Sequence, residues 1–231
     1  MTRASSTRKP TRNQIRKRRE IFEAALDTFS EHGLRGATLE QIAAAAGLSK
    51  QNVIYYFDGK EAIYRELLES LLDRWLAPLR ALSPEGEPVA EILTYMRRKL
   101  EMSRDMPRES RLFATEILRG APLLREELQG GLRALVDEKA AVIAGWAAAG
   151  RIAPVDPHHL IFSIWAMSQH YADFDIQVCA VLGAARSPGR FDEAGRFLET
   201  ALMRMLGHDG PEFGQSAAPV PPPDGNSGPR H

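Results

Sequence analysis

The sequence predicts an all-α fold of about nine helices, in which a small three-helix unit precedes a larger helical domain. Apolar residues recur at spacings of three and four along most of the chain, as they do on the buried face of a helix. No segment alternates with the two-residue period of a strand over a useful length. Near the N-terminal end, Gly47 separates two short helical segments, a pattern typical of a helix-turn-helix. We therefore expect one domain at residues 15–59 and a second at 60–207.

The first helix is predicted from an apolar stripe that ends at His32-Gly33. Its apolar side chains share one face, which we expect to pack on the two helices that follow. This face consists of Ile15, Phe22, Ala25, Leu26 and Phe29.

Residues 37–61 predict a pair of short helices joined by a glycine turn. Thr38 can cap the first helix and Ser49 the second, because a hydroxyl group accepts a hydrogen bond from a free backbone N–H group. Gly47 tolerates the left-handed backbone that a sharp turn requires. The inward face of the first helix consists of Ile42, Ala43 and Ala46. Its four alanines, residues 43–46, have almost no bulk, so the second helix, predicted at Lys50–Tyr56, can cross it closely.

The second of these helices carries hydrogen-bonding side chains suited to DNA. Lysine donates to guanine edges or phosphates, and glutamine and asparagine pair with adenine edges. Tyrosine hydroxyl groups suit phosphate oxygens. An amphipathic helix pair within an enzyme is the ordinary alternative. We expect Lys50, Gln51, Asn52, Tyr55 and Tyr56 on the exposed face, and Val53, Ile54 and Phe57 packed inward.

Charge is unevenly distributed along a chain of 231 residues whose formal net charge is zero. Residues 1–57 hold ten basic side chains and five acidic ones, so this end carries +5 and the remainder −5. Basic charge beside a helix-turn-helix favours binding to phosphate. We expect residues 1–14 to form a flexible basic arm that becomes ordered on DNA. A solubilising tail is the alternative interpretation.

The larger domain is predicted from six further helical segments. A long helix from Lys60 should link the two domains, with Trp75 on its buried stripe. In the following helix, Arg97, Arg98 and Lys99 are expected to face mostly outward. The six segments are Lys60–Leu82, Val89–Arg104, a helix from Pro107 closed by Gly120, Pro122–Ala149, Asp156–Val181 and Phe191–Leu206.

Composition predicts a cytoplasmic protein. Cys179 is the only cysteine, so an intrachain disulfide is impossible, and we interpret it as a small core residue. No uncharged stretch reaches the ~18 residues needed to span a bilayer, and no apolar leader follows the basic N-terminus, so we expect no membrane contact. Residues 208–231 are rich in Gly, Pro and Ser, which predicts a disordered tail.

The helix-turn-helix pattern resembles the DNA-binding signature of the TetR family of one-component transcriptional regulators. The resemblance rests on Thr38, Ile42-Ala43, Ala46-Gly47-Leu48-Ser49, Tyr56-Phe57 and Lys60-Glu61. It implies a homodimer that binds a palindromic double-stranded DNA operator and acts as a repressor. It also implies that the last two long helices form a four-helix bundle across a two-fold axis. The DNA-binding residues that it suggests are Thr38, Ser49, Lys50, Gln51, Asn52, Tyr55, Tyr56 and Lys60.

Several phrases of the larger domain resemble one subgroup of this family, the pyrimidine-utilisation repressors, which sense uracil and thymine. They are RWLAPLRAL, GAPLLREEL, DEKAAVIAGW and HLIFSIWAMSQHYADFDIQV. The similarity extends from about residue 15 to residue 206. It implies that the larger domain binds an effector such as uracil or thymine, and that ligand binding releases the protein from DNA.

Five residues of the larger domain suit a planar pyrimidine. Trp165, Gln169 and Asp173 follow at i, i+4 and i+8, so they line one face of a helix. An indole offers a flat wall, an amide can both donate and accept, and a carboxylate can accept a ring N–H. Trp75 and Phe113 can close the site, although each aromatic residue could equally be a plain core residue. Gln169 needs a polar partner in so apolar a helix.

Two other functional hypotheses remain open. The first is a regulator of the same family that binds a different small hydrophobic ligand. The second is an all-α hydrolase that uses Asp173 and His170, although the sequence contains no nucleophile elbow, P-loop or dinucleotide fingerprint. His158, His159 and His170 lack the spacing of a metal site. We therefore predict no enzyme activity, no catalytic residues, no metal and no cofactor.

Overall fold

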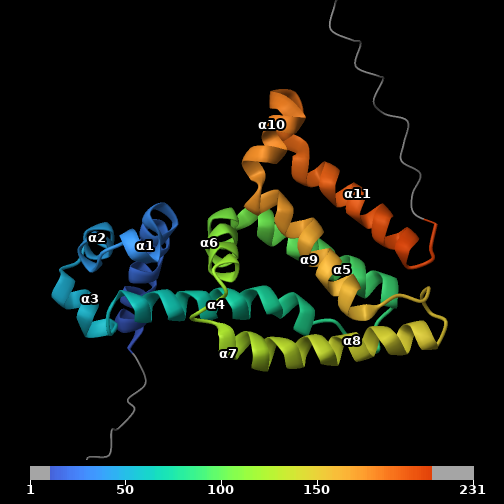
Figure 1. The fold of residues 1–231 in the computed structure, drawn as a ribbon, viewed down its shortest axis with the longest axis horizontal. Helices are drawn as coiled ribbons and strands as arrows, with labels where there is room; N and C mark the ends of the chain where they lie inside the picture. The colour runs from blue at the N-terminus through green and yellow to red at the C-terminus, as the bar shows by residue number, and fades with distance from the viewer. Residues whose placement is uncertain (1–10, 210–231) are drawn as a thin grey trace, which may run out of the picture.

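The computed structural model describes residues 11–209, which contain helices and no strand (Figure 1). The predicted basic arm and Pro-rich tail therefore lie largely outside the described residues. The helices are α1 (Arg12–Gly36), α2 (Leu39–Ala45), α3 (Lys50–Tyr56), α4 (Lys60–Arg80), α5 (Pro88–Asp105), α6 (Pro107–Leu118), α7 (Arg125–Glu127), a π-helical turn (Leu128–Leu132), α8 (Arg133–Ala148), α9 (Pro157–Asp173), α10 (Asp175–Arg186), a 3-10 turn (Ser187–Gly189) and α11 (Arg190–Met205).

The helices form two units joined by α4. Figure 1 shows α1, α2 and α3 at one end, with α4 running from them alongside α7 and α8 into the larger domain. If α7, the π-helical turn and α8 are counted as one helix, and the interrupted pair α9 and α10 as another, residues 11–209 contain nine helices. The predicted all-α architecture is therefore confirmed.

Each unit has its own hydrophobic core, and α4 contributes to both. Phe29, Ile42 and Val53 belong to the first core, which continues into α4 and α6 and includes Trp75. Leu79, one turn further along α4, belongs to the second core, which α5, α8, α9 and α11 complete. A movement of α4 would therefore be felt in both cores.

Helix boundaries follow local backbone chemistry. Helical geometry in α1 breaks at Gly33, which has a φ of 65°, close to the predicted end of the first helix. The helix predicted to begin at Pro122 begins later, because Gly120 and Ala121 both have positive φ angles after α6. After the three residues of α7, a π-helical turn contains Gly130-Gly131, where two glycines weaken regular helix formation.

The helix predicted at Asp156–Val181 is interrupted. Phe174, between α9 and α10, has a φ of −115° and a ψ of 28°, outside the helical region. Apolar side chains around and beyond this break are exposed, Ile176 most of all at 89%. Among residues 11–209, no helix combines the length and the apolar character needed to cross a lipid bilayer.

Candidate functional site

The turn between α2 and α3 has the predicted caps. The Thr38 hydroxyl accepts a hydrogen bond from the backbone N–H of Gln41 at 3.2 Å, and the Ser49 hydroxyl accepts one from Asn52 at 3.2 Å. Gly47 adopts a φ of 63°, where a side chain would strain the backbone. Both hydroxyl groups thus fix helix starts in this structure. Their contact with DNA stays a prediction.

Helix α3 presents most of its side chains to solvent. Lys50, Gln51, Asn52 and Tyr55 are exposed, Tyr55 to 73%. Lys50 pairs with Glu40 of α2 at 2.7 Å. Within this helix, Val53 is the one buried residue. The structure thus brings the predicted polar face together on one short helix.

The expected inward position of Ile54 is wrong. Its side chain is 49% exposed, whereas Val53 and Phe57 are buried. Residues four apart share a helix face, so Val53 and Phe57 lie together and Ile54 points about 100° away. An exposed isoleucine beside polar side chains can contact a thymine methyl group. Ile54 is therefore a candidate that the sequence reasoning missed.

Internal contacts hold α3 against its neighbours. Arg18 of α1 donates to the backbone oxygen of Tyr56 at 2.9 Å, lies over the Phe57 ring and pairs with Glu66 of α4. Lys60 Nζ donates to the backbone oxygens of Leu34 at 2.9 Å and Ala37 at 2.8 Å. Its ammonium is thus occupied within the protein. A contact of Lys60 with phosphate stays a prediction.

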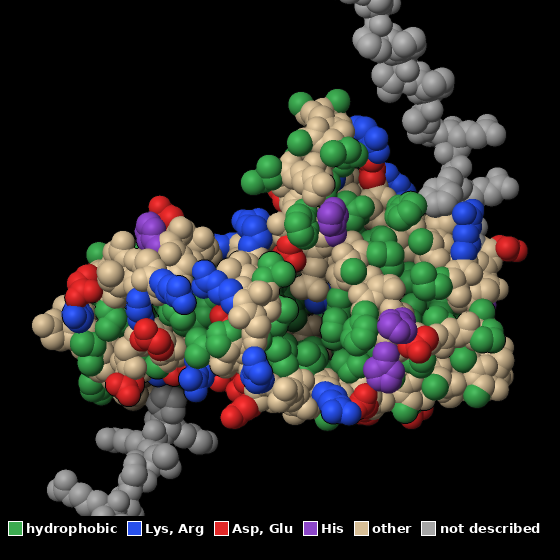
Figure 2. Space-filling view, viewed as in Figure 1, with side chains coloured by type: hydrophobic (Ala, Val, Ile, Leu, Met, Phe, Trp, Pro, Cys, Tyr) green, Lys and Arg blue, Asp and Glu red, His purple; other side chains and the backbone are tan. Residues whose placement is uncertain are grey.

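A second candidate site lies in the larger domain. Figure 2 shows a hollow in the area that Figure 1 bounds with α4, α6, α8 and α9, with hydrophobic side chains around it and a basic side chain visible inside. The predicted residues Trp75 and Phe113 meet edge to face, with ring centroids 5.1 Å apart. Because α4 and α6 supply these two rings, they join the two helices by an aromatic contact.

A buried lysine and a half-buried aspartate lie near these aromatic rings. Lys99 is 4% exposed, so its expected outward position is wrong, and its Nζ lies 5.6 Å from the centroid of the Trp75 ring. Burial lowers the pKa of Lys99 to about 8, although the Asp173 carboxylate acts in the opposite direction. Burial also raises the pKa of Asp173, which accepts a hydrogen bond from Ser110 Oγ at 2.5 Å. Phe113 thus contacts Trp75, Lys99 lies beside Trp75, and Asp173 acts on Lys99 through its charge.

Trp165 and Gln169 lie on α9, two turns and one turn before Asp173. The Trp165 indole N–H donates to the hydroxyl of Tyr95, which is buried in α5. Burial raises the pKa of Tyr95, so that this hydroxyl stays protonated. Gln169 is half-buried, and among the described residues its amide has no hydrogen-bonding partner. Roles of Trp165 and Gln169 in ligand binding stay predictions.

Helix α6 connects the hollow to the N-terminal unit. Ser110 bonds to Asp173, and Arg111 donates to the backbone oxygen of Ala172 at 3.3 Å. In the preceding turn, Arg108 pairs with Asp27 and Glu23 of α1. One end of α6 therefore contacts both α1 of the N-terminal unit and α9 of the larger domain.

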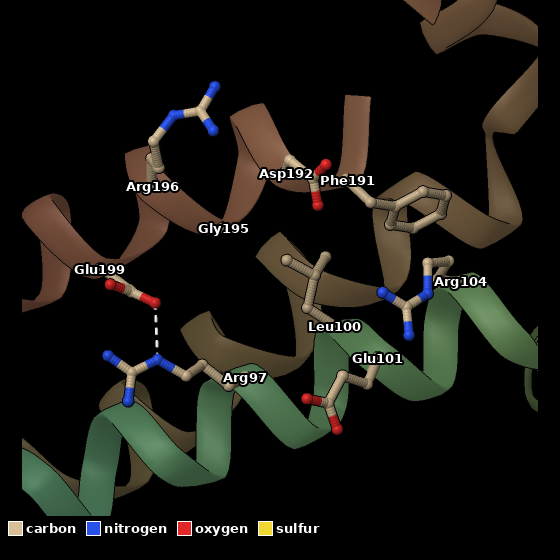
Figure 3. Close-up of a pocket in the computed structure, with 9 residues that line it drawn as sticks. All are labelled: Arg97, Leu100, Glu101, Arg104, Phe191, Asp192, Gly195, Arg196 and Glu199. Atoms are coloured by element: carbon tan, nitrogen blue, oxygen red, sulfur yellow. Dashed lines mark hydrogen bonds and ion pairs between the residues drawn. The ribbon is translucent and has the colours of Figure 1, made fainter. Parts of the chain in front are cut away.

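Another cleft, of about 320 Å³, lies between α5 and α11. Figure 3 shows Arg97 and Glu199 facing each other across it, with Nε and Oε1 2.6 Å apart. The remaining charged lining residues are of both signs, and none is a predicted site residue. Over residues 11–209, no group of three or more His, Cys, Asp or Glu side chains is arranged to hold a metal ion.

Both units of the chain match known protein families. Residues 21–67 match the family model described as bacterial regulatory proteins, tetR family, and residues 68–209 match the model described as YcdC-like protein, C-terminal region. The chain is 56% identical over 179 residues to the HTH-type transcriptional regulator RutR of Escherichia coli strain K12. The aligned stretch covers 78% of this chain and 84% of that relative. A stretch of that length necessarily includes Trp75 to Asp173.

Solved structures share the fold at lower identity. A putative transcriptional regulator, SCO4942 from Streptomyces coelicolor, superposes with a TM-score of 0.66 and 23% identity over 82% of this chain and 98% of that one. AibR, solved with isovaleryl coenzyme A and operator DNA, gives a TM-score of 0.53 and 21% identity over 68% of this chain and 85% of that one. At these identities, the similarity shows the fold alone.

Proposed function

Because the chain belongs to the TetR family of bacterial regulatory proteins, it is a transcriptional regulator, and we propose that it is a homodimeric repressor released from its operator by uracil or thymine. The relatives at this identity are regulators rather than enzymes. The observation that carries the proposal is the combination of an exposed polar face on α3 with an aromatic and carboxylate cluster at the hollow.

For DNA, the proposal assigns base reading to α3. Gln51 and Asn52 suit adenine edges, Lys50 suits guanine or phosphate, and the tyrosine hydroxyl groups suit phosphates. In a two-fold dimer, two α3 helices ~34–36 Å apart fit successive major grooves on one side of a palindrome. We expect Thr38 and Ser49 to serve chiefly as caps that aim this face.

For the effector, the proposal places a planar pyrimidine at the hollow. The Trp75 and Phe113 rings supply apolar walls, and Asp173 can accept a ring N–H. A ligand that enters there displaces contacts of α4 and α6, the two helices that reach the N-terminal unit. Ligand binding would alter DNA affinity to the extent that it favours the DNA-incompetent arrangement.

The test uses DNA selected from a random pool by the purified full-length protein. We expect a palindrome, bound in fluorescence anisotropy and released by uracil or thymine without their chemical conversion. A reporter gene placed behind this palindrome should be repressed and then restored by uracil. If no DNA sequence is selected, the proposed binding to a specific operator is wrong. If uracil and thymine leave DNA binding unchanged, the proposed effector is wrong. Chemical conversion of uracil would favour the hydrolase hypothesis.

The dimer has its own test at Ile176, which is 89% exposed on α10. Ile176→Glu places a charge on an apolar surface without disturbing the core, so sedimentation should show monomers with an unchanged helical spectrum. Leu202→Glu is the control, because Leu202 is fully buried in its own domain and a charge there should unfold the chain. A dimer retained by Ile176→Glu would exclude α10 from the interface.

A further inference from the structure

Lys99 is a buried cation whose ammonium contacts the Trp75 ring. It is 4% exposed, and among the described residues its Nζ forms neither a hydrogen bond nor an ion pair. A buried ammonium is normally paired, because loss of hydration is costly. In the described part of the chain, every fully enclosed side-chain nitrogen and oxygen has a hydrogen-bonding partner. Lys99 Nζ therefore keeps access to open space, which a ligand bound beside Trp75 could occupy.

Lys139 shows what a structural buried lysine looks like in the same domain. It is 6% exposed, but its Nζ donates to the backbone oxygen of Leu82 at 3.2 Å and pairs with Glu138 at 3.0 Å. Lys99 has no equivalent partners. The two lysines differ in whether the protein itself satisfies the ammonium, which leaves the donors of Lys99 available to a ligand.

The environment of Lys99 narrows the chemistry of that ligand. Trp75 lies beside the ammonium, and Asp173 is close enough to favour its charged form. Arg111 and His170 also act on the Asp173 carboxylate but are exposed to solvent. In the interior, Lys99 and Asp173 therefore balance each other, which disfavours both an anionic and a cationic ligand. An aromatic wall flanked by a donor and an acceptor instead suits a neutral planar ring that carries a carbonyl beside an N–H.

We propose that Lys99 and Asp173 together determine effector specificity: Lys99 donates to the C4 carbonyl of the pyrimidine ring, and Asp173 accepts from the adjacent N3–H. This inference rests on the proposed function and deepens it. Uracil and thymine present the C4 carbonyl beside the N3–H on one edge of the ring. Cytosine presents a bare ring nitrogen and an amino group there, which would place an acceptor opposite Asp173 and a donor opposite Lys99.

Calorimetric titration of the full-length protein with uracil tests the pair. Lys99→Met keeps the length and apolar stem of the side chain but removes the donor, so we expect uracil binding to weaken by roughly 10- to 100-fold. Lys139→Met is the matched control and should bind uracil as wild type does. Equal uracil affinity in Lys99→Met and wild type would overturn the proposal while leaving the effector assignment intact.

A ligand series on wild-type protein gives a second test that does not depend on how a variant folds. Uracil should bind, whereas 3-methyluracil, in which a methyl group replaces the N3–H, and cytosine, which has no N3–H and carries an amino group at C4, should each bind at least tenfold more weakly. Equal affinity for uracil and cytosine would overturn the specificity pair. Binding of none of these bases would overturn the proposed effector, and the pair with it.

Discussion

Lysines serve the two candidate sites in opposite ways. On α3, Lys50 is exposed and forms a surface ion pair with Glu40, so it contributes little to the free energy of unfolding. At the hollow, Lys99 is buried beside Trp75, and burial lowers its pKa to about 8. A charge at a surface site thus costs the fold little free energy, whereas a charge buried at an interior site lowers the free energy of unfolding. Substitutions should separate the two regions by their effect on stability.

The largest effect is expected from Lys99→Met on the free energy of unfolding. The pKa of Lys99 is about 8 in the folded chain against 10.5 ordinarily, so the unfolded chain binds more protons between these values. Stability therefore rises with pH across that window. At pH 7 the burial penalty is fully present, and Lys99→Met should be more stable by up to about 3 kcal/mol.

Denaturant titrations from pH 7 to pH 10.5 measure this difference, which should shrink above pH 8. Lys139→Met provides the contrast, since it leaves the Leu82 carbonyl without its partner and should destabilise the chain by ~1–3 kcal/mol. A Lys99→Met variant that is less stable than wild type at pH 7 would make Lys99 an ordinary structural lysine.

A smaller effect, on DNA affinity rather than stability, is expected from Asn52→Ala. Asn52 is exposed and its side chain supports no internal contact, so the melting temperature should not change. Loss of a bidentate base contact should weaken binding to the selected palindrome by about 2 kcal/mol. Fluorescence anisotropy on the palindrome and on a scrambled duplex separates base reading from phosphate contact. Equal losses on both duplexes would remove Asn52 from base reading.

The smallest effect is expected from Arg108→Ala, which removes the ion pairs between α6 and α1. Its partners Asp27 and Glu23 are largely exposed, so the stability change should be only about 0.5–1 kcal/mol. If α6 transmits ligand binding, release from DNA should need more uracil although uracil affinity is unchanged. Arg98→Ala, which removes a pair within α5, is the control. Identical release curves for both variants would exclude this route.

Local rules predicted the DNA-binding unit well, because short-range chemistry determines it. Thr38, Gly47 and Ser49 each act within four residues, and the structure has the caps and the turn in those places. Ile54 was misplaced because α3 has only seven residues and buries Val53 alone, which leaves too narrow an inward face for a third residue. DNA contacts themselves cannot be inferred from such local geometry.

The hollow was only half predictable. Lys99 lies at i+7 from Ile92 and i+3 from Met96, both buried, so the helical period already placed it on the inward stripe. The sequence-based expectation nevertheless placed Lys99 outward, because lysine is rarely buried. The pairing of Ser110 with Asp173 joins residues 63 positions apart, and no local pattern encodes such a contact. Trp75 and Phe113, which the sequence predicted to close the site, lie ring to ring, whereas Trp165 contacts Tyr95 instead.

The most direct test of the link between the two regions compares the uracil affinity of free protein with that of protein bound to its selected palindrome. Coupling between two binding sites is reciprocal, so if uracil weakens DNA binding, DNA must weaken uracil binding by the same factor. We predict a reduction of at least tenfold on DNA, equal to the factor by which saturating uracil weakens operator affinity. Equal uracil affinity in the presence and absence of DNA would contradict the account, because the hollow and α3 would then act independently.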